Sequence, residues 1–496
     1  MDLRQVVRGS FWLSAGYVVS NFLGFVYWFL IFPIVPPSTV GKAATVIAVV
    51  SVLLSILSLG IPIGILRLLR AENTCGDASA LGSYFYSSLV FLFILDATTA
   101  LIFLSLGLFG KNIPLDPESI VFASVLMLLG LNGWPLVVTS LFNSTLKTEY
   151  ISLTQMIAGL ARIVTGIPLV YFGLGFRGIM IGYIVALLVS DILLLLFAGK
   201  ILSVFGADFS TSFKAITDSI AAGVAAWIPS VLSLTSQWSS LLFLGGFVGN
   251  HGTGTYFMAY SVTIGVLAFP LNILSLMFPV LSSMSDGRKS FMGRAVRIAS
   301  ALMYPLLFIL IAYSAIVSSF LGEAYSSAST SITILAMGFF LAPLVYGYYY
   351  YVYARGKYSD VTIIGIAENF PRQILYIILI PAFSDVGASI SFSAGFISSL
   401  LFVAILSKKT AYRLYPENSL KMFLIPLPSF LFSLTLPPLI GIPLILMSSY
   451  VAYARLKLVT REDLEEISNA LLSKQVLANL SPYVKPILKV LFGDQS

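Results

Sequence analysis

The sequence of 496 residues is poor in the residues that most enzymes use for chemistry. It contains one cysteine, Cys75, and one histidine, His251. A single cysteine excludes a disulfide within the chain and a cysteine-rich metal site, and a single histidine excludes a histidine cluster. The sequence also lacks the phosphate-binding loop of Walker-type ATPases, the paired-histidine zinc helix and the nucleophile elbow of hydrolases. We therefore expect no cofactor and no catalytic centre in this chain.

Charged residues are scarce as well. They make up 10% of the chain, whereas soluble domains contain roughly 25%. Hydrophobic residues make up 58%, and the mean hydropathy is +0.97. Apolar runs of about 20 residues, the length that spans a bilayer, recur as far as residue 458. The composition therefore predicts an all-α polytopic membrane protein.

The spacing of these runs predicts about 14 transmembrane helices. The first run follows Arg4 and Arg8, as in a signal peptide, but it is longer and has no small-residue cleavage site. We therefore interpret it as the first retained helix. The predicted helices lie near residues 11–32, 42–66, 83–109, 119–145, 150–172, 177–199, 217–247, 254–281, 297–321, 329–353, 360–381, 386–406, 420–436 and 438–456.

The net charge of +7 follows from the predicted topology and requires no nucleic-acid partner. With the N-terminus in the cytoplasm, most of the 28 Lys and Arg residues fall in cytoplasmic segments. Only Lys42, Lys111 and Arg177 fall outside, and Arg162 and Arg372 fall within the membrane. Such asymmetry obeys the positive-inside rule. We therefore predict a multi-pass protein of the plasma membrane with both termini in the cytoplasm.

Spaced matches between the two halves of the chain indicate an internal duplication. Matching residues are about 210 positions apart, and each copy would hold six helices. Because six is even, both copies enter the membrane in the same direction and are related by an axis along the membrane normal. The matching pairs are Lys147 and Arg355, Tyr150 and Tyr358, Thr154 and Thr362, and Gly41 and Gly254. Arg162 falls within a couple of residues of the position that matches Arg372.

We predict four parts from this pattern. Residues 1–205 form an N-terminal six-helix lobe, and residues 206–410 form a C-terminal six-helix lobe. Residues 411–458 form an extra transmembrane hairpin that has no counterpart in the repeat. Residues 459–496 form a cytoplasmic amphipathic tail, because the apolar runs stop and a capped helix with early acidic residues begins.

Five ionisable residues fall within the predicted spans, where a charge costs at least a few kcal/mol unless it meets a partner or water. Glu368 and Arg372 are one helical turn apart and can neutralise each other. Because a guanidinium binds two phosphate oxygens at once, Arg162 and Arg372 are candidate ligands for a diphosphate. Asp96, Asp191 and Glu368 either carry coupling ions or balance the arginines. A purely structural Glu368–Arg372 pair is the alternative.

Three further polar residues are candidates for binding a sugar. Asn21 lies in the first predicted helix, and Gln237 lies in a run of hydroxyl side chains in the seventh. Tyr349 belongs to a tyrosine-rich segment at the end of the tenth helix. Amides and hydroxyls inside membranes also join helices together, and tyrosines also form interfacial belts, so both uses stay open.

Several segments resemble the polysaccharide and O-antigen flippases of the multidrug/oligosaccharidyl-lipid/polysaccharide exporter superfamily. The resemblance is carried by Val40-Gly41, 57–70, 146–150, 175–183, 237–261 and 278–285. It implies two six-helix lobes, alternating access to a central cavity and transfer of a polyprenyl-diphosphate-linked oligosaccharide from the cytoplasmic to the outer leaflet, for polysaccharide or glycoprotein glycan assembly. The implied partners are this substrate, membrane lipids, and glycosyltransferases or a polymerase of the same pathway.

Residues 20–28 distinguish the alternatives within this superfamily. Peptidoglycan-precursor flippases have two arginines and an aspartate in the comparable stretch, and this sequence has none of them. Drug/cation antiporters commonly use a carboxylate in helix 1, which is also missing here. A cation-coupled multidrug antiporter is the second interpretation. A membrane-embedded glycosyltransferase or polymerase is the third, against which the short outer loops argue.

Overall fold

In the computed structural model the protein is all α-helical over residues 16, 19–75, 78–109, 115–284, 286–412 and 416–471, which are the residues that the structure describes. No β-strand occurs among them. Seven helices are long and apolar enough to cross a membrane, or up to nine if each of two bent helix pairs is one span. The predicted fold class is confirmed, and the number of fourteen spans stays a prediction.

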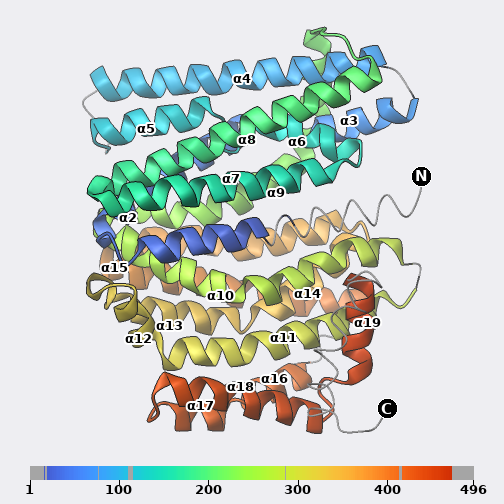
Figure 1. Ribbon diagram of the computed structural model, residues 1–496. Coiled ribbons are helices and arrows are strands. Elements are labelled where there is room, and N and C mark those ends of the chain that lie inside the picture. The colour runs from blue at the N-terminus through green and yellow to red at the C-terminus, as the bar shows by residue number, and fades with distance from the viewer. Residues whose placement is uncertain are drawn as a thin grey trace. The chain divides into compact units, whose positions relative to one another are not determined.

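Helices follow one another with short connections throughout the described residues. A first apolar helix, Val19–Ile31, precedes those labelled in Figure 1. The others are α2 (Pro37–Leu57), α3 (Ile61–Cys75), α4 (Ala78–Phe109), α5 (Pro117–Leu128), α6 (Pro135–Ser144), α7 (Thr148–Leu169), η1 (Val170–Leu174), α8 (Gly175–Phe205), α9 (Phe213–Phe247), α10 (Asn250–Ser283), α11 (Arg288–Ala312), α12 (Ser314–Phe320), η2 (Glu323–Tyr325), α13 (Ala328–Phe339), α14 (Ala342–Ala354), α15 (Tyr358–Thr410), α16 (Pro416–Leu424), α17 (Leu427–Ser433), α18 (Pro438–Arg455) and α19 (Arg461–Leu471).

Two long helical segments each contain a reversal of the chain. Between α7 and α8 the π-helical turn η1 includes Gly173 with φ +88°, a conformation that glycine adopts readily. Within α15 the reversal is at Ser384, with φ +54°. Gly182 then packs against Gly166, which shows that α8 runs back along α7. Each segment is therefore an antiparallel pair of helices, as the predicted sequence ranges require.

The described helices group into two compact units. One comprises Met1–Met258 with Tyr376–Asp385, and the other comprises Ala259–Leu375 with Val386–Ser496. The first unit extends past the predicted lobe boundary at residue 205 because α9 packs along α2 and α3. The division into two six-helix lobes, an extra hairpin and a tail stays a prediction.

In the first unit, the fourth predicted span is broken into two helices. α5, which lies beside α4 in Figure 1, ends at Leu128, and α6 begins at Pro135. Gly130 and Asn132 between them have positive φ, and Pro135 occupies the first turn of α6, where its missing N–H costs nothing. This break positions backbone amides in the interior of the unit.

In the second unit, α11 packs against α14 and the α17–α18 hairpin, and a short helix docks at one end. Asp463 of α19 is buried and binds Arg297 of α11 at 2.7 Å. Thr460 and Asp463 also cap the helix reciprocally through their backbone amides. The predicted tail therefore begins with a docked helix, and residues 472–496 lie outside the described residues.

Candidate functional site

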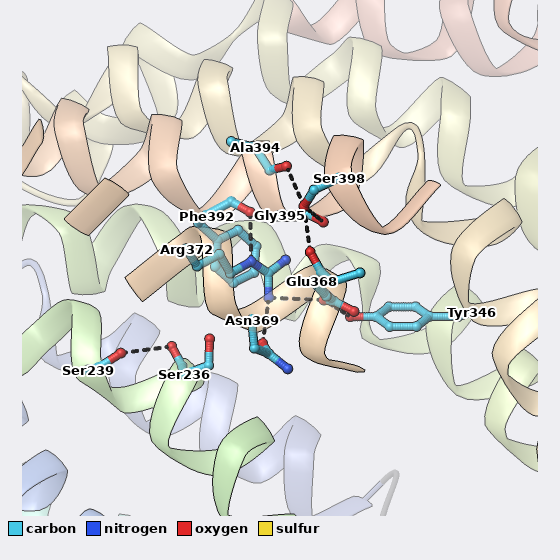
Figure 2. A network of polar contacts seen from close by, with 11 residues as sticks. Ser236, Ser239, Tyr346, Glu368, Asn369, Arg372, Phe392, Ala394, Gly395 and Ser398 are labelled. Carbon is cyan, nitrogen blue, oxygen red and sulfur yellow. Dashed lines mark hydrogen bonds and ion pairs between the residues drawn. The ribbon is translucent and has the colours of Figure 1, made fainter. Parts of the chain in front are cut away.

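Arg372 in α15 is enclosed and neutralised. Its guanidinium contacts the Glu368 carboxylate at 2.9 Å and donates from Nε to the carbonyl of Phe392 at 2.9 Å (Figure 2). The rings of Phe392 and Phe396 lie 4.2 and 4.9 Å from it. Tyr346 donates a long hydrogen bond of 3.4 Å to Glu368. Only 5% of the Arg372 side chain is exposed, so a ligand could reach it only if these contacts opened.

Arg162 in α7 lies in a different environment. The rings of Tyr27 and Tyr183 lie 5.0 and 4.9 Å from its guanidinium carbon. Tyr27 donates to the carbonyl of Ile179, and Trp28 donates to the Tyr183 hydroxyl, so both rings are fixed. In the described part of the chain no carboxylate pairs with Arg162, and its Nε has no hydrogen-bond acceptor. The charge is half-buried, and no acid among the described residues compensates it.

The predicted duplication puts Arg162 within a couple of residues of the position that matches Arg372, but the two arginines differ in their surroundings. Arg162 and Arg372 are 210 positions apart, and Tyr183 and Phe392, the rings across each hairpin, are 209 positions apart. Four positions before Arg372 stands Glu368, whereas Ala158 stands four positions before Arg162. The first copy therefore keeps the arginine and its aromatic ring without the acid that neutralises it.

Asp96 in α4 holds the broken span together. It is 1% exposed and accepts a hydrogen bond of 2.8 Å from the backbone amide of Trp134, directly before α6. The N-terminus of a helix carries partial positive charge, which favours a carboxylate. Gly133 leaves the space that the carboxylate needs, since a Cβ there would overlap Asp96. The geometry fits a structural role better than ion coupling.

Variants of Asp96 test this role. Asp96→Ala should lower the stability by about 1–3 kcal/mol, because it leaves the buried Trp134 amide without an acceptor. Asp96→Asn retains a carbonyl acceptor and should lose less. Melting of the purified protein in detergent, with translocation measured in parallel, checks this order. An Asn variant that melts like the native protein but has lost ion-dependent transport would contradict a structural role.

Asp191 in α8 is buried as well, but it differs from Asp96 in its contacts. Neither of its carboxylate oxygens has a hydrogen-bond partner among the residues that the structure describes. Its side chain is 6% exposed within the first unit. Of the three predicted intramembrane acids, Glu368 meets an arginine, Asp96 meets a backbone amide and Asp191 meets neither.

The predicted sugar-binding residues lie on more accessible surfaces. Asn21 and Gln237 are exposed within the first unit. Tyr349 is half-buried in the second unit, on a face of α14 where its ring contacts Tyr350 and Tyr353. The rings that contact the two arginines were missed from the sequence. An aromatic residue about 20 positions after each arginine is the signal that a helical hairpin would bring it alongside.

At the end of the first unit that is predicted to face outward, ion pairs connect the N-terminal ends of α2, α5 and α8. Lys42 of α2 contacts Asp116 at 2.9 Å and Glu118 at 3.0 Å, and Glu118 also pairs with Arg177 of α8. Burial raises the pKa of Asp116, but hydrogen bonds from Ser119 and Lys42 outweigh it and hold that pKa below its ordinary value. This contribution to stability is present above the ordinary Asp pKa and is lost as the pH falls through the lowered one.

Arginines and carboxylates inside apolar helical hairpins are typical of membrane transporters, in which such residues mark transport pathways. The chain matches the model of the polysaccharide biosynthesis protein family over residues 6–285, more than half of its length. It belongs to that family. The resemblance predicted from the sequence is therefore confirmed.

Individual relatives agree with this assignment. The chain is 24% identical over 260 residues to a probable flippase, AglR, of Haloferax volcanii. The match covers 49% of this chain and 52% of that relative, so the chain matches only about half of the relative's length.

Solved structures show the fold. The lipid II flippase MurJ in an inward closed conformation has a TM-score of 0.64 at 16% identity, over 90% of this chain and 99% of that one. An inward-facing multidrug resistance MATE family transporter of the MOP superfamily has a TM-score of 0.61 at 15% identity, over 82% and 98%. The fold of the chain is that of MOP superfamily transporters.

Proposed function

We propose that the protein is a flippase that moves a polyprenyl-diphosphate-linked oligosaccharide from the cytoplasmic to the outer leaflet by alternating access. Membership of the polysaccharide biosynthesis protein family supports a role in glycan assembly. The relative named as a probable flippase and the structural similarity to a lipid II flippase support translocation of a lipid-linked cargo. The protein acts as a transporter rather than an enzyme in this proposal.

Arg162 is the observation that carries the proposal. A cation inside an apolar span costs roughly 2.5–3.5 kcal/mol even by the lower estimates, and Arg162 has no acid among the described residues to offset this cost. A diphosphate carries the opposite charge and matches the two-pronged geometry of a guanidinium. We assign Arg162 as the first phosphate contact, with Tyr27 and Tyr183 holding it in place.

The other predicted residues take supporting roles. Arg372 becomes a second phosphate contact only in a state in which Glu368 releases it, so Glu368 balances its charge until then. Asp191 is assigned to ion coupling and Asp96 to the structure of the broken span. Asn21, Gln237 and Tyr349 are assigned to the sugar, because amides and tyrosine rings suit a polyhydroxylated ligand.

The direction of transport and the cellular context follow from the predicted topology. In this proposal both termini lie in the cytoplasm and the protein lies in the plasma membrane; the concentration of basic residues in the predicted cytoplasmic segments supports this orientation. Lipid-linked oligosaccharides are assembled from activated sugars, so glycosyltransferases of the same pathway must supply the cargo. A polymerase or a transferase on the outer side must then consume it.

A cation-coupled multidrug antiporter is the second candidate function. It is favoured by Asp191, whose two oxygens are buried without partners in the described residues, as a site that binds a cation or proton would be. In an antiporter Arg162 would repel cationic drugs, which is why we rank this function second.

Reconstitution distinguishes the two functions. We expect proteoliposomes to move a fluorescent polyprenyl-diphosphate disaccharide between leaflets at least about tenfold faster than protein-free vesicles do, measured by its access to a membrane-impermeant lectin. A parallel assay measures efflux of a lipophilic cation driven by a proton or sodium gradient. Efflux without disaccharide movement would replace the flippase by the antiporter.

A further inference from the structure

The short helix α19 lies across the second unit instead of along it. In Figure 1 it runs across the direction of α11 and α18. Its Asp463 meets α11 near the N-terminal end of that helix, at Arg294 and Arg297. α11 is one of the helices that are long and apolar enough to span a membrane. A helix that crosses the end of a spanning helix lies along the membrane surface, at the level of the lipid headgroups.

A buried carboxylate anchors α19 in this position. Oδ1 of Asp463 lies 2.7 Å from Nη2 of Arg297 and 3.8 Å from Nε of Arg294. Next to it, Leu464 packs against the core cluster that includes Phe291. α19 has 11 residues, and a helix of this length is marginal in water by itself. The docked position of α19 therefore depends on these tertiary contacts, the ion pair among them.

The two arginines are arranged like a phosphate-binding pair in which a carboxylate takes the place of the phosphate. They are three positions apart on one face of α11, and both point toward the same oxygen of Asp463. The Asp463 side chain is 5% exposed, whereas the side chains of Arg294 and Arg297 are 33% and 24% exposed. The acid is enclosed, but the cations can be reached from the surface beside α19. A guanidinium binds phosphate oxygens in the same way as carboxylate oxygens.

The position of the pair along α11 suits a phosphate that belongs to a lipid. The span predicted from the sequence begins at residue 297, on the cytoplasmic side, so the pair stands at the edge of the hydrocarbon. Arg288 and Lys289 at the start of α11 add positive charge at the same end, where they donate to the carbonyls of Met284 and Ala411. Anionic lipids of the inner leaflet are attracted to such basic groups. A lipid phosphate therefore competes with Asp463 for the same two arginines.

We propose that Arg294 and Arg297 form a binding site for a lipid phosphate at the cytoplasmic end of the second unit. Asp463 occupies this site in the structure, and the phosphate displaces it and releases α19. An anionic phospholipid and a polyprenyl diphosphate both have the required chemistry. The inference goes beyond the proposed function, because a phospholipid can fill the site whether or not the protein moves a saccharide. In either case α19 acts as a sensor of phosphate at the inner leaflet.

Hydrogen exchange of the backbone amides of α19 tests the site in the full chain. The protein is placed in nanodiscs of neutral phosphatidylcholine, to which phosphatidylglycerol or a polyprenyl diphosphate is added. We expect one or both lipids to accelerate exchange in Arg461–Leu471 about tenfold, the order expected when a charge-assisted hydrogen bond is lost. A polyprenol without phosphate should leave the exchange unchanged. The lipid that acts identifies the source of the phosphate.

Variants connect this response to the arginine pair. Asp463→Asn should exchange rapidly even without a phosphate lipid, because the ion pair that holds α19 is lost. The double variant Arg294→Gln/Arg297→Gln should also exchange rapidly, and added lipid should not change it further. Arg288→Gln/Lys289→Gln is the matched control, since it removes two charges at the same end whose donors bond to backbone carbonyls. It should behave like the native protein. Equal lipid responses of the two double variants would overturn the site.

The native chain decides the question even if a variant fails to insert. Exchange in α19 that neither phosphate lipid accelerates would overturn the proposed site, whatever the variants do. Failure of the proposed function is distinguishable from this result. A response to phosphatidylglycerol without translocation of a lipid-linked saccharide would leave this site in place and remove the cargo. Translocation without any response of α19 would leave the flippase in place and remove this site.

Discussion

Arg162→Ala is expected to abolish translocation of a polyprenyl-diphosphate saccharide while the protein still folds and inserts. Hydrogen bonds to a charged group contribute about 1.5–3 kcal/mol, so losing the guanidinium should slow translocation by at least roughly tenfold. Arg162→Lys keeps the charge but not the two-pronged geometry and should retain part of the activity. The measurement is leaflet exchange in proteoliposomes, with the amount of reconstituted protein matched.

Stability separates a ligand-binding role of Arg162 from a structural one. Stacking against Tyr27 and Tyr183 contributes roughly 0.5–2 kcal/mol, whereas an uncompensated cation inside a span costs roughly 2.5–3.5 kcal/mol. Removing Arg162 should therefore leave the melting temperature unchanged or raise it. Arg372→Ala is the matched control and should melt clearly lower, because it leaves Glu368 buried without its partner.

The opposite results for translocation or for stability would remove the main support for a diphosphate-linked substrate. If Arg162→Ala is stable and translocates at the native rate, the arginine is not a phosphate contact. If Arg162→Ala unfolds while Arg372→Ala is stable, Arg162 has the structural role and Arg372 does not. Either outcome is visible from two melting curves and one exchange assay, without knowledge of the native glycan.

Hydrophobic length made the membrane class and the paired helices predictable from the sequence. A run of about 20 apolar residues has few stable alternatives to a spanning helix, so the hairpins around η1 and Ser384 lie where the runs require them. The pairing of Glu368 with Arg372 was predictable for a similar reason, since residues four apart share a helix face. These inferences depend only on local geometry.

Contacts between distant residues were not predictable in this way. Asp96 accepts from the amide of Trp134, 38 positions away, and nothing near Asp96 in the sequence indicates a broken helix there. The break itself depends on Gly130 and Asn132 adopting positive φ, which a helical pattern does not reveal. The association of α9 with α3 depends on close approach at Gly64 and Gly223, and that of α10 with α2 depends on Gly41. An isolated glycine in an apolar run does not identify its partner.

The difference between the two arginines was visible in the sequence but needed the structure to be interpreted. Glu368 stands four positions before Arg372 and Ala158 stands four positions before Arg162, so only the second arginine has an acid one turn before it. An acid on any neighbouring helix could neutralise Arg162, and the sequence alone does not show which helices are its neighbours. The structure shows tyrosine rings there and, in its described residues, no carboxylate paired with the guanidinium.

A thermodynamic cycle on Glu368 and Arg372 should show strong coupling between the two residues. Each side chain is at most 10% exposed, and their charged atoms are 2.9 Å apart. Breaking a buried ion pair by removing one partner costs about 3–5 kcal/mol, because the other charge stays in a medium that cannot solvate it. Glu368→Gln and Arg372→Met should each lower stability by amounts of this order.

The double variant should lose less than either single variant, because it strands no charge. Gln and Met preserve most of the volume that Phe392, Phe396 and Tyr346 pack against, so packing losses stay small beside the charge effect. Thermal melting of the four proteins in one detergent gives the interaction energy directly. Losses that simply add would mean that the contact at 2.9 Å contributes no coupling, and the release of Arg372 by Glu368 during transport would then have no energetic basis.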